Sequence, residues 1–197
     1  MNQTNILLAG VGGQGVVTAG ILMGNVAAAA GLNTVMSEIH GMSQRGGVVL
    51  AELRMGDVYG PIVPDGAADL LLGFEAVETL RAMQRAGRKT RVMMSTERIV
   101  PFTVNVGDAT YPDVSPAIAR LRERGVKLDV IDAPGLAREA GNPLSSNVVL
   151  VGAAYAGGFI PAPKEALEEA IGKMFPARSL ASNLRALELG MRACKES

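Results

Sequence analysis

Six residues near the start of the chain, Gly10–Gly15 (GVGGQG), have the composition and spacing of a loop that binds a phosphate group. Glycines place no side chain in the way, so backbone N–H groups can approach an anion closely. The N-terminus of a following helix adds about half a positive charge. The spacing fits the G-x-G-x-x-G pattern, which is informative where it follows a strand and opens a helix. No Lys-Ser or Lys-Thr follows Gly15, which excludes a Walker A loop.

A second polar stretch, Ser37–Gly47 (SEIHGMSQRGG), brings the first charges into the chain, because residues 1–36 contain no Asp, Glu, Lys or Arg. Glu38 follows the glycine turn by about 20 residues, where a carboxylate that binds a ribose hydroxyl is expected. The stretch also holds His40, the sole histidine, and Arg45, the first basic residue. A charge-assisted hydrogen bond from such a cation contributes roughly 1.5–3 kcal/mol.

Each of these features also has a purely structural explanation. A glycine turn between a strand and a helix is also found where only close packing requires it. Glu38 and Arg45 are equally compatible with a surface ion pair worth roughly 0–1 kcal/mol. A single histidine is more often structural than functional. Neither a catalytic residue nor a set of metal ligands is predicted. The candidate binding residues are Gly10, Gly12, Gly13, Gln14, Gly15, Glu38, His40, Ser43, Gln44, Arg45 and Gly46.

The elements that position these residues follow from hydrophobic patterning. A strand at 5–10, a helix at 14–31 and a strand at 32–38 form a βαβ unit, which predicts a parallel pair of adjacent strands. Both polar stretches then leave carboxyl ends of strands and face one crevice. Further strands are expected at 47–56, 68–74, 91–95, 100–106 and 126–132, and helices at 75–87, 113–125, 146–158, 163–175 and 179–195.

This alternation predicts an α/β fold, a three-layer Rossmann-like sandwich with a mainly parallel sheet and a helical C-terminal tail. The length of 197 residues suits a single domain spanning residues 1–197, and 48% hydrophobic residues suffice for a substantial core. The longest apolar run, residues 148–160, is too short to span a bilayer. No basic residue precedes the apolar stretch at 16–32, so it does not match a signal peptide, and we expect a cytoplasmic protein.

Composition excludes several classes of function. Basic and acidic residues balance at 19 each, and aromatic residues make up 4%, which argues against nucleic acid or a membrane surface as a partner. The one cysteine, Cys194, excludes an intrachain disulfide, a zinc finger and a four-thiolate iron–sulfur cluster. A reducing compartment is expected.

Four segments together resemble the gamma subunit or domain of 2-oxoacid:ferredoxin oxidoreductases. They are ILLAGVGGQGVVTAG (6–20), SEIHGMSQRGGVV (37–49), ADLLLGFEAVETLR (68–81) and NVVLVGAAYAGGFIP (147–161). The HGMSQRGG segment favours the indolepyruvate branch of that family. The resemblance implies oxidative decarboxylation of a 2-oxoacid with coenzyme A, giving an acyl-CoA, carbon dioxide and reduced ferredoxin.

The resemblance also implies a division of labour between subunits. Family members use thiamine diphosphate and iron–sulfur clusters, yet this chain has one cysteine and no G-D-G motif followed by asparagines; VGDAT (106–110) breaks that pattern at Ala109. Both cofactors are therefore expected on a larger alpha subunit, with coenzyme A as a co-substrate suited to the glycine turn. Two alternatives stay open: a stand-alone NAD(P)- or nucleotide-binding Rossmann protein, and a structural subunit whose glycine turn is empty.

Overall fold

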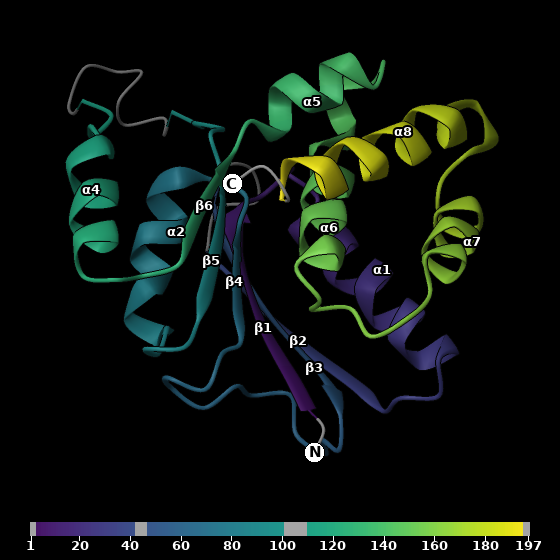
Figure 1. The fold of residues 1–197 in the computed structure, drawn as a ribbon, viewed down its shortest axis with the longest axis horizontal. Coiled ribbons are helices and arrows are strands. Elements are labelled where there is room, and N and C mark those ends of the chain that lie inside the picture. Colours follow the sequence, from purple (N-terminus) through teal and green to yellow (C-terminus); the bar gives the residue numbers. More distant parts are fainter. Residues whose placement is uncertain (1–2, 42–46, 101–109, 195–197) are drawn as a thin grey trace.

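The structure is a computed structural model that describes residues 3–41, 47–100 and 110–194. These residues form one six-stranded sheet between two layers of helices (Figure 1). The strands are β1 (Gln3–Val11), β2 (Thr34–His40), β3 (Val48–Gly56), β4 (Leu70–Gly73), β5 (Arg91–Ser95) and β6 (Leu128–Ile131). Their order across the sheet is β2-β3-β1-β4-β5-β6.

Helices cover the two faces of the sheet unequally. They are α1 (Val16–Ala29), α2 (Ala76–Ala82), α4 (Ser115–Glu123), α5 (Ala133–Glu139), α6 (Ser146–Ala156), α7 (Lys164–Met174) and α8 (Ala177–Ala193), with 3-10 turns η1 (Met83–Arg85) and η2 (Pro143–Ser145). One face packs against the layer of α1 and α5–α8, and the other against α2 and α4. This is the three-layer α/β sandwich with a helical C-terminal tail that the sequence predicts.

The sheet is mainly parallel, as predicted, but its first two strands are not neighbours. The pairs β1–β4, β4–β5 and β5–β6 are parallel, whereas β3 runs antiparallel to both β1 and β2. The predicted adjacency of β1 and β2 is therefore wrong, because β3 lies between them. A short connection from β2 leads straight into an antiparallel hairpin, which needs no crossover helix. The carboxyl ends of β1 and β2 still point to the same edge of the sheet.

The central strand β1 contributes to the core on both faces. Ile6 and Leu8 point into the layer of α1 and α6, whereas Leu7 and Ala9 point into the layer of α2 and α4. All four side chains are buried, which explains the continuous apolar run in the sequence. The end of β1 is thereby fixed from both sides, and the glycine turn that follows has a rigid base.

A buried ion pair holds the 57–69 connection and the 3-10 turn η1 against β3. Glu52 is 1% exposed, and its carboxylate accepts hydrogen bonds from Arg85 Nη1 at 3.2 Å and from the Val63 N–H. Arg85 also donates to the Val63 carbonyl at 2.6 Å and pairs with Asp65. The hydrogen bond that Arg85 donates to the Glu52 carboxylate raises the pKa of Arg85, so the guanidinium stays charged.

We expect Arg85→Ala to lower the free energy of unfolding by about 3 kcal/mol, because it leaves the Glu52 carboxylate buried without a cation. Urea unfolding of the isolated chain measures this. Lys173→Ala is the matched control, since it removes a cation from an exposed ion pair with Glu169 on α7. Equal losses in both variants would show that the buried pair has no special role.

Several element boundaries differ from the sequence prediction. The helix α5 is absent from the predicted set, because Pro134 and Gly135 in its first turn suggest a loop; the Asp132 side chain caps it by accepting from the Gly135 N–H at 3.0 Å. The helix α8 begins at Ala177 rather than at Ser179. Most of the strand expected at 100–106 lies outside the described residues.

Candidate functional site

The glycine turn and the β2–β3 connection meet through a backbone hydrogen bond. The Gly12 N–H donates to the Gly47 carbonyl at 2.8 Å, immediately before β3 begins. The two polar stretches singled out in the sequence are thus in contact where the turn leaves β1. The expectation that they share one edge of the sheet is confirmed, although the strands that carry them are not adjacent.

Two glycines of the turn have backbone conformations that other residues seldom adopt. Gly13 has φ 102° and Gly15 has φ 74°, both in the left-handed region. A side chain on Gly15 would meet Asn147 Nδ2 at 2.6 Å, so the turn packs against the start of α6 here. A side chain on Gly13 would meet no atom within 4 Å, and Gly13 is exposed. Gly13 is therefore the open point of the turn.

The helix that follows the turn begins without a side-chain cap. Gly15 occupies the N-cap position of α1, no side chain accepts from the first N–H groups, and the first turn contains no acidic residue. Within the described residues, therefore, no side chain caps this helix end by accepting a hydrogen bond from its first N–H groups. Together with the exposed Gly13 backbone, this geometry suits an oxyanion that approaches from outside.

The Gln14 side chain stabilises the turn through three hydrogen bonds. Its amide oxygen accepts from the Val11 N–H at 2.8 Å, and its amide nitrogen donates to the Phe74 carbonyl at 2.9 Å and to Glu97 Oε2 at 3.0 Å. Gly10 lies beneath this amide, because a Cβ there would meet Gln14 Oε1 at 2.8 Å. Gln14 thus joins the ends of β1 and β4, and Gly10 makes room for it.

Glu38 and His40 lie on the edge strand, away from the turn. Both point to the same side of β2, and His40 Nε2 is 3.4 Å from Glu38 Oε2, with both side chains about half exposed. Because β3 separates β2 from β1, Glu38 does not lie beside the turn as a ribose-binding carboxylate would. The other candidates from this stretch, Ser43, Gln44, Arg45 and Gly46, lie outside the described residues.

A buried carboxylate that sequence reasoning missed organises the next strand end. Glu75 is 2% exposed and caps α2 by accepting from the Glu78 N–H at 2.9 Å. Its other oxygen accepts from the Tyr111 hydroxyl and from the Ile99 N–H. Burial, followed by the hydrogen bond to Glu75, raises the pKa of Tyr111, so this hydroxyl stays protonated and donates. Glu is not a preferred N-cap residue, and the bond to Tyr111 joins residues 36 positions apart, so no local pattern predicts this role of Glu75.

The polar side chains at the β4–β6 end of this edge include two carboxylates and one cation, Arg98, whose guanidinium lies 5.9 Å from the centre of the Tyr111 ring. Glu97 is held by Gln14, and Asp132 accepts from the Thr96 hydroxyl at 3.1 Å. Among the described residues no group of three or more His, Cys, Asp or Glu side chains is placed to hold a metal ion. Within the described residues no helix has the length and apolar character needed to cross a membrane.

The single cysteine, Cys194, lies at the end of α8 and is 7% exposed. Burial raises the pKa of its thiol, and the nearby Arg91 guanidinium, with Nη2 3.5 Å from Sγ, only partly opposes this. We expect slow alkylation by iodoacetamide at neutral pH in the folded chain and rapid alkylation in denaturant, as followed by mass spectrometry. Equal rates in both conditions would contradict the buried placement of the thiol.

Comparison with known proteins identifies the class to which this fold and turn belong. Residues 5–193 match the family model described as pyruvate ferredoxin/flavodoxin oxidoreductase. Indolepyruvate oxidoreductase subunit IorB of Methanothermobacter thermautotrophicus is 40% identical over 98% of each chain, and that of Thermococcus kodakarensis is 42% identical over 100% of this chain and 98% of its own. The chain therefore belongs to the pyruvate ferredoxin/flavodoxin oxidoreductase family.

Solved structures support the fold independently of the sequence. The gamma subunit of a keto/oxoacid ferredoxin oxidoreductase from Geobacter sulfurreducens superposes with a TM-score of 0.73 at 21% identity, covering 98% of this chain and 99% of its own. A 2-oxoglutarate:ferredoxin oxidoreductase from Magnetococcus marinus gives 0.78 at 22% identity, covering all of this chain but 32% of the longer one. The family resemblance seen in the sequence is confirmed, and the stand-alone Rossmann alternative is not favoured.

Proposed function

We propose that this chain is the small, cofactor-free subunit of a cytoplasmic indolepyruvate:ferredoxin oxidoreductase. In this role it completes the active site for the oxidative decarboxylation of indolepyruvate or a related aryl pyruvate. The 2-oxoacid and coenzyme A are converted to an acyl-CoA and carbon dioxide, and the electrons released reduce ferredoxin. Ferredoxin docks to the assembled enzyme rather than to this chain alone.

The choice of indolepyruvate as the substrate rests on a difference in sequence identity between two groups of relatives. Four subunits named as indolepyruvate oxidoreductase are 38–42% identical to this chain. Two subunits named as 2-oxoglutarate synthase are 28–29% identical over comparable lengths. The chain thus lies nearer the indolepyruvate branch than the 2-oxoglutarate branch.

The residues present fit coenzyme A but not the other cofactors of such an enzyme. The exposed Gly13 backbone and the uncapped start of α1 suit a phosphate group of coenzyme A. Cys194 is the sole cysteine, so no iron–sulfur cluster can be ligated by thiolates of this chain, and the thiamine diphosphate motif is absent from its sequence. We place both of these cofactors on the larger subunit.

This chain then acts by binding and positioning rather than by forming bonds. The turn holds the anionic end of coenzyme A through backbone N–H groups, and Gln14 keeps the turn fixed to β1 and β4. The ligand is thereby presented at the edge of the sheet where the partner's chemistry takes place. A fixed position lowers the entropic cost of bringing two reactants together.

Co-expression with the larger subunit tests this function. We expect the assembled complex to reduce a viologen dye with indolepyruvate, dependent on coenzyme A, and much more slowly with pyruvate or 2-oxoglutarate. The isolated small chain is expected to be colourless, iron-free and inactive. Stoichiometric iron in the isolated chain, or 2-oxoacid oxidation without a partner, would refute the proposal. Tight NAD(P) binding by the isolated chain would favour the nucleotide-binding alternative instead.

A further inference from the structure

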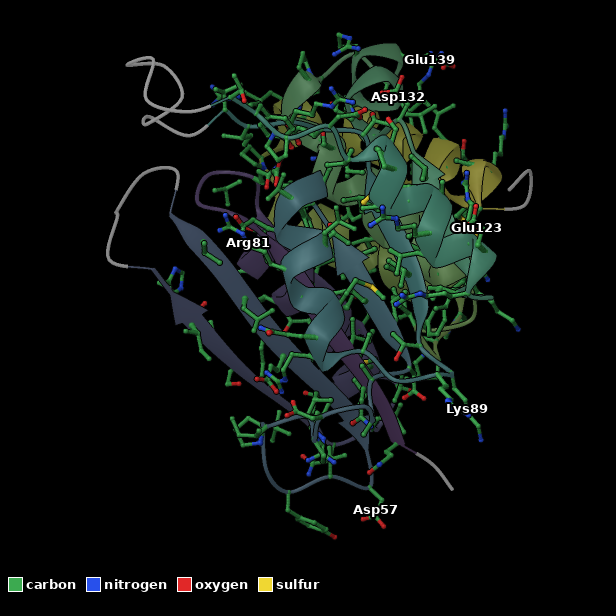
Figure 2. All side chains as sticks on the ribbon, turned by 90° about the vertical axis from the view of Figure 1, so that its left-hand side faces the viewer. Asp57, Arg81, Lys89, Glu123, Asp132 and Glu139 are labelled. Carbon is green, nitrogen blue, oxygen red and sulfur yellow. The ribbon has the colours of Figure 1, made fainter. Side chains whose placement is uncertain are left out.

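One face of the hairpin of β2 and β3 is covered by none of the described helices. Figure 2 shows α2 and α4 lying over the sheet while these two strands extend beyond them. The main helix contacts on this side are those of α2 with β1, β4 and β5, and of α4 with β6. The opposite side of the same strands packs against α1. We call the uncovered side the hairpin face; its residues are Val35, Ser37 and Ile39 from β2, and Val48 and Leu50 from β3.

The strand register places these residues on one side. Ile39 is the cross-strand partner of Leu50, and Leu50 packs with the core of the α2 layer. Met36, with the opposite parity, packs against Gly20 of α1. Ile39 is 56% exposed and Val48 is 40% exposed. They are diagonal neighbours, so their exposed areas adjoin.

Within the part of the chain that the structure describes, the exposed residues of the hairpin face, Ile39 and Val48, are apolar, and the face carries no free charge. The charged residues of β2, Glu38 and His40, point to the other side of the strand. On β3, Glu52 is engaged by Arg85, and Arg54 donates to the carbonyls of Gly60 and Ile62. These bonds bring the 57–63 connection over the far end of the face. The uncovered part is thus the end that adjoins the 41–47 connection.

The outer edge of the hairpin is equally unprotected. Within the described residues β2 pairs with β3 alone, and its sequence TVMSEIH contains no proline, lysine or arginine that would discourage pairing with another chain. The helix α2 carries one cation, Arg81. This residue lies on the side of the helix that faces the β2–β3 hairpin (Figure 2). It is paired with Glu78 at 3.1 Å.

We propose that the hairpin face of β2 and β3 is the surface on which the larger, cofactor-bearing subunit docks. This inference rests on the proposed function. The face is continuous with the Gly47 carbonyl that bonds the glycine turn, so a chain seated on it reaches the candidate site. Its uncharged, apolar character suits a permanent subunit interface, whereas an acidic electron carrier would require a basic patch. In the Magnetococcus marinus structure the same fold makes up 32% of a longer chain, so there it is permanently joined to further structure.

Cysteine footprinting of the co-expressed complex tests this surface without disrupting it. Ile39→Cys and the control Ile21→Cys, on the exposed side of α1, are made in a Cys194→Ser background; the parent residues are 56% and 43% exposed. We expect maleimide labelling at position 39 to slow roughly 10-fold or more on assembly, because an interface core excludes solvent. Labelling at position 21 should not change.

A second experiment tests the same surface with a charged substitution. We expect Ile39→Lys to weaken binding of the larger subunit roughly 10-fold or more, since it buries an unpaired charge, while Ile21→Lys has no effect. The thermal unfolding of both isolated variants should match that of the parent, because both positions are exposed.

The outcomes separate this inference from the proposed function. If the parent forms an active complex in which position 39 labels as fast as in the free chain, the docking surface is wrong and the function stands. Concentration-dependent protection of position 39 in the isolated chain would identify a second copy of the chain as the occupant. If the parent and the larger subunit do not assemble, the proposed function fails and this inference fails with it.

Discussion

Replacing Gly190 by alanine is expected to lower the free energy of unfolding by about 3 kcal/mol, the upper end of the usual cost of overpacking. A methyl group at this position of α8 would overlap the carbonyl of Val149 in α6. Gly152 of α6 stands in the reciprocal position, where a methyl group would overlap the Leu187 carbonyl of α8. Both obstacles are backbone atoms, so one helix must move away from the other. Urea unfolding with the isolated chain measures the loss.

The control for Gly190→Ala is another helical glycine with space around it. A Cβ on Gly172 in α7 would meet its nearest neighbour, Leu180 Cδ1, at 3.9 Å. Alanine is favoured over glycine in an open helical position by about 1 kcal/mol, so Gly172→Ala should stabilise the chain. Opposite signs at the two positions would establish the close crossing of α6 and α8. A neutral or stabilising Gly190→Ala would show that the two helices lie farther apart.

This crossing illustrates what sequence patterns can and cannot predict. The helical character of residues 146–158 and 179–195 follows from their composition. The helix α6 lies within the first range, and α8 overlaps the second but begins two residues earlier. A glycine inside a helical pattern signals a packing or functional reason, yet the pattern does not name the partner. The partners Val149 and Leu187 become visible only when the two helices are placed in space.

The strand order shows the same limit in the sheet. Patterning located β1, β2 and β3 within a few residues of their observed bounds, because buried and half-buried strands have a clear hydrophobic period. It does not encode which strand lies beside which. A helix between β1 and β2 suggested that they pair, whereas the short 41–47 connection makes β2 pair with β3 and places β3 next to β1.

For the candidate site, local reasoning correctly predicted where the glycine turn lies in the chain. The glycine turn lies between a strand and a helix, as its pattern requires, and it contacts Gly47 of the second stretch. The hydrogen-bond partners of the side chains are harder to predict from the sequence. Gln14 was expected to face a ligand, whereas its amide is occupied by Val11, Phe74 and Glu97. The bonds to Phe74 and Glu97 join residues 60 and 83 positions apart, beyond the range of any local pattern.

The largest expected effect on ligand use comes from placing a carboxylate at Gly13. We expect Gly13→Asp to raise the KM for coenzyme A in the assembled enzyme roughly 10–150-fold, equivalent to losing about 1.5–3 kcal/mol of charge-assisted bonding. The new side chain enters space that is open in the chain alone, so it meets the ligand rather than the protein. Asp tolerates a positive φ better than most residues, which limits the strain. Steady-state kinetics with varied coenzyme A measures the change.

Two further variants separate charge, size and strain in this experiment. Gly13→Asn has nearly the same shape without the charge, so we expect a smaller rise in KM. Gly31→Asp places the same carboxylate on a glycine with φ 84° and open surroundings beyond the other end of α1, so it should leave the KM unchanged. Because the negative charge of Asp opposes an anion, added salt should reduce the difference between Gly13→Asp and Gly13→Asn. If Gly13→Asp and Gly31→Asp both use coenzyme A as the parent does, the turn serves packing alone and its assignment as the anion site is wrong.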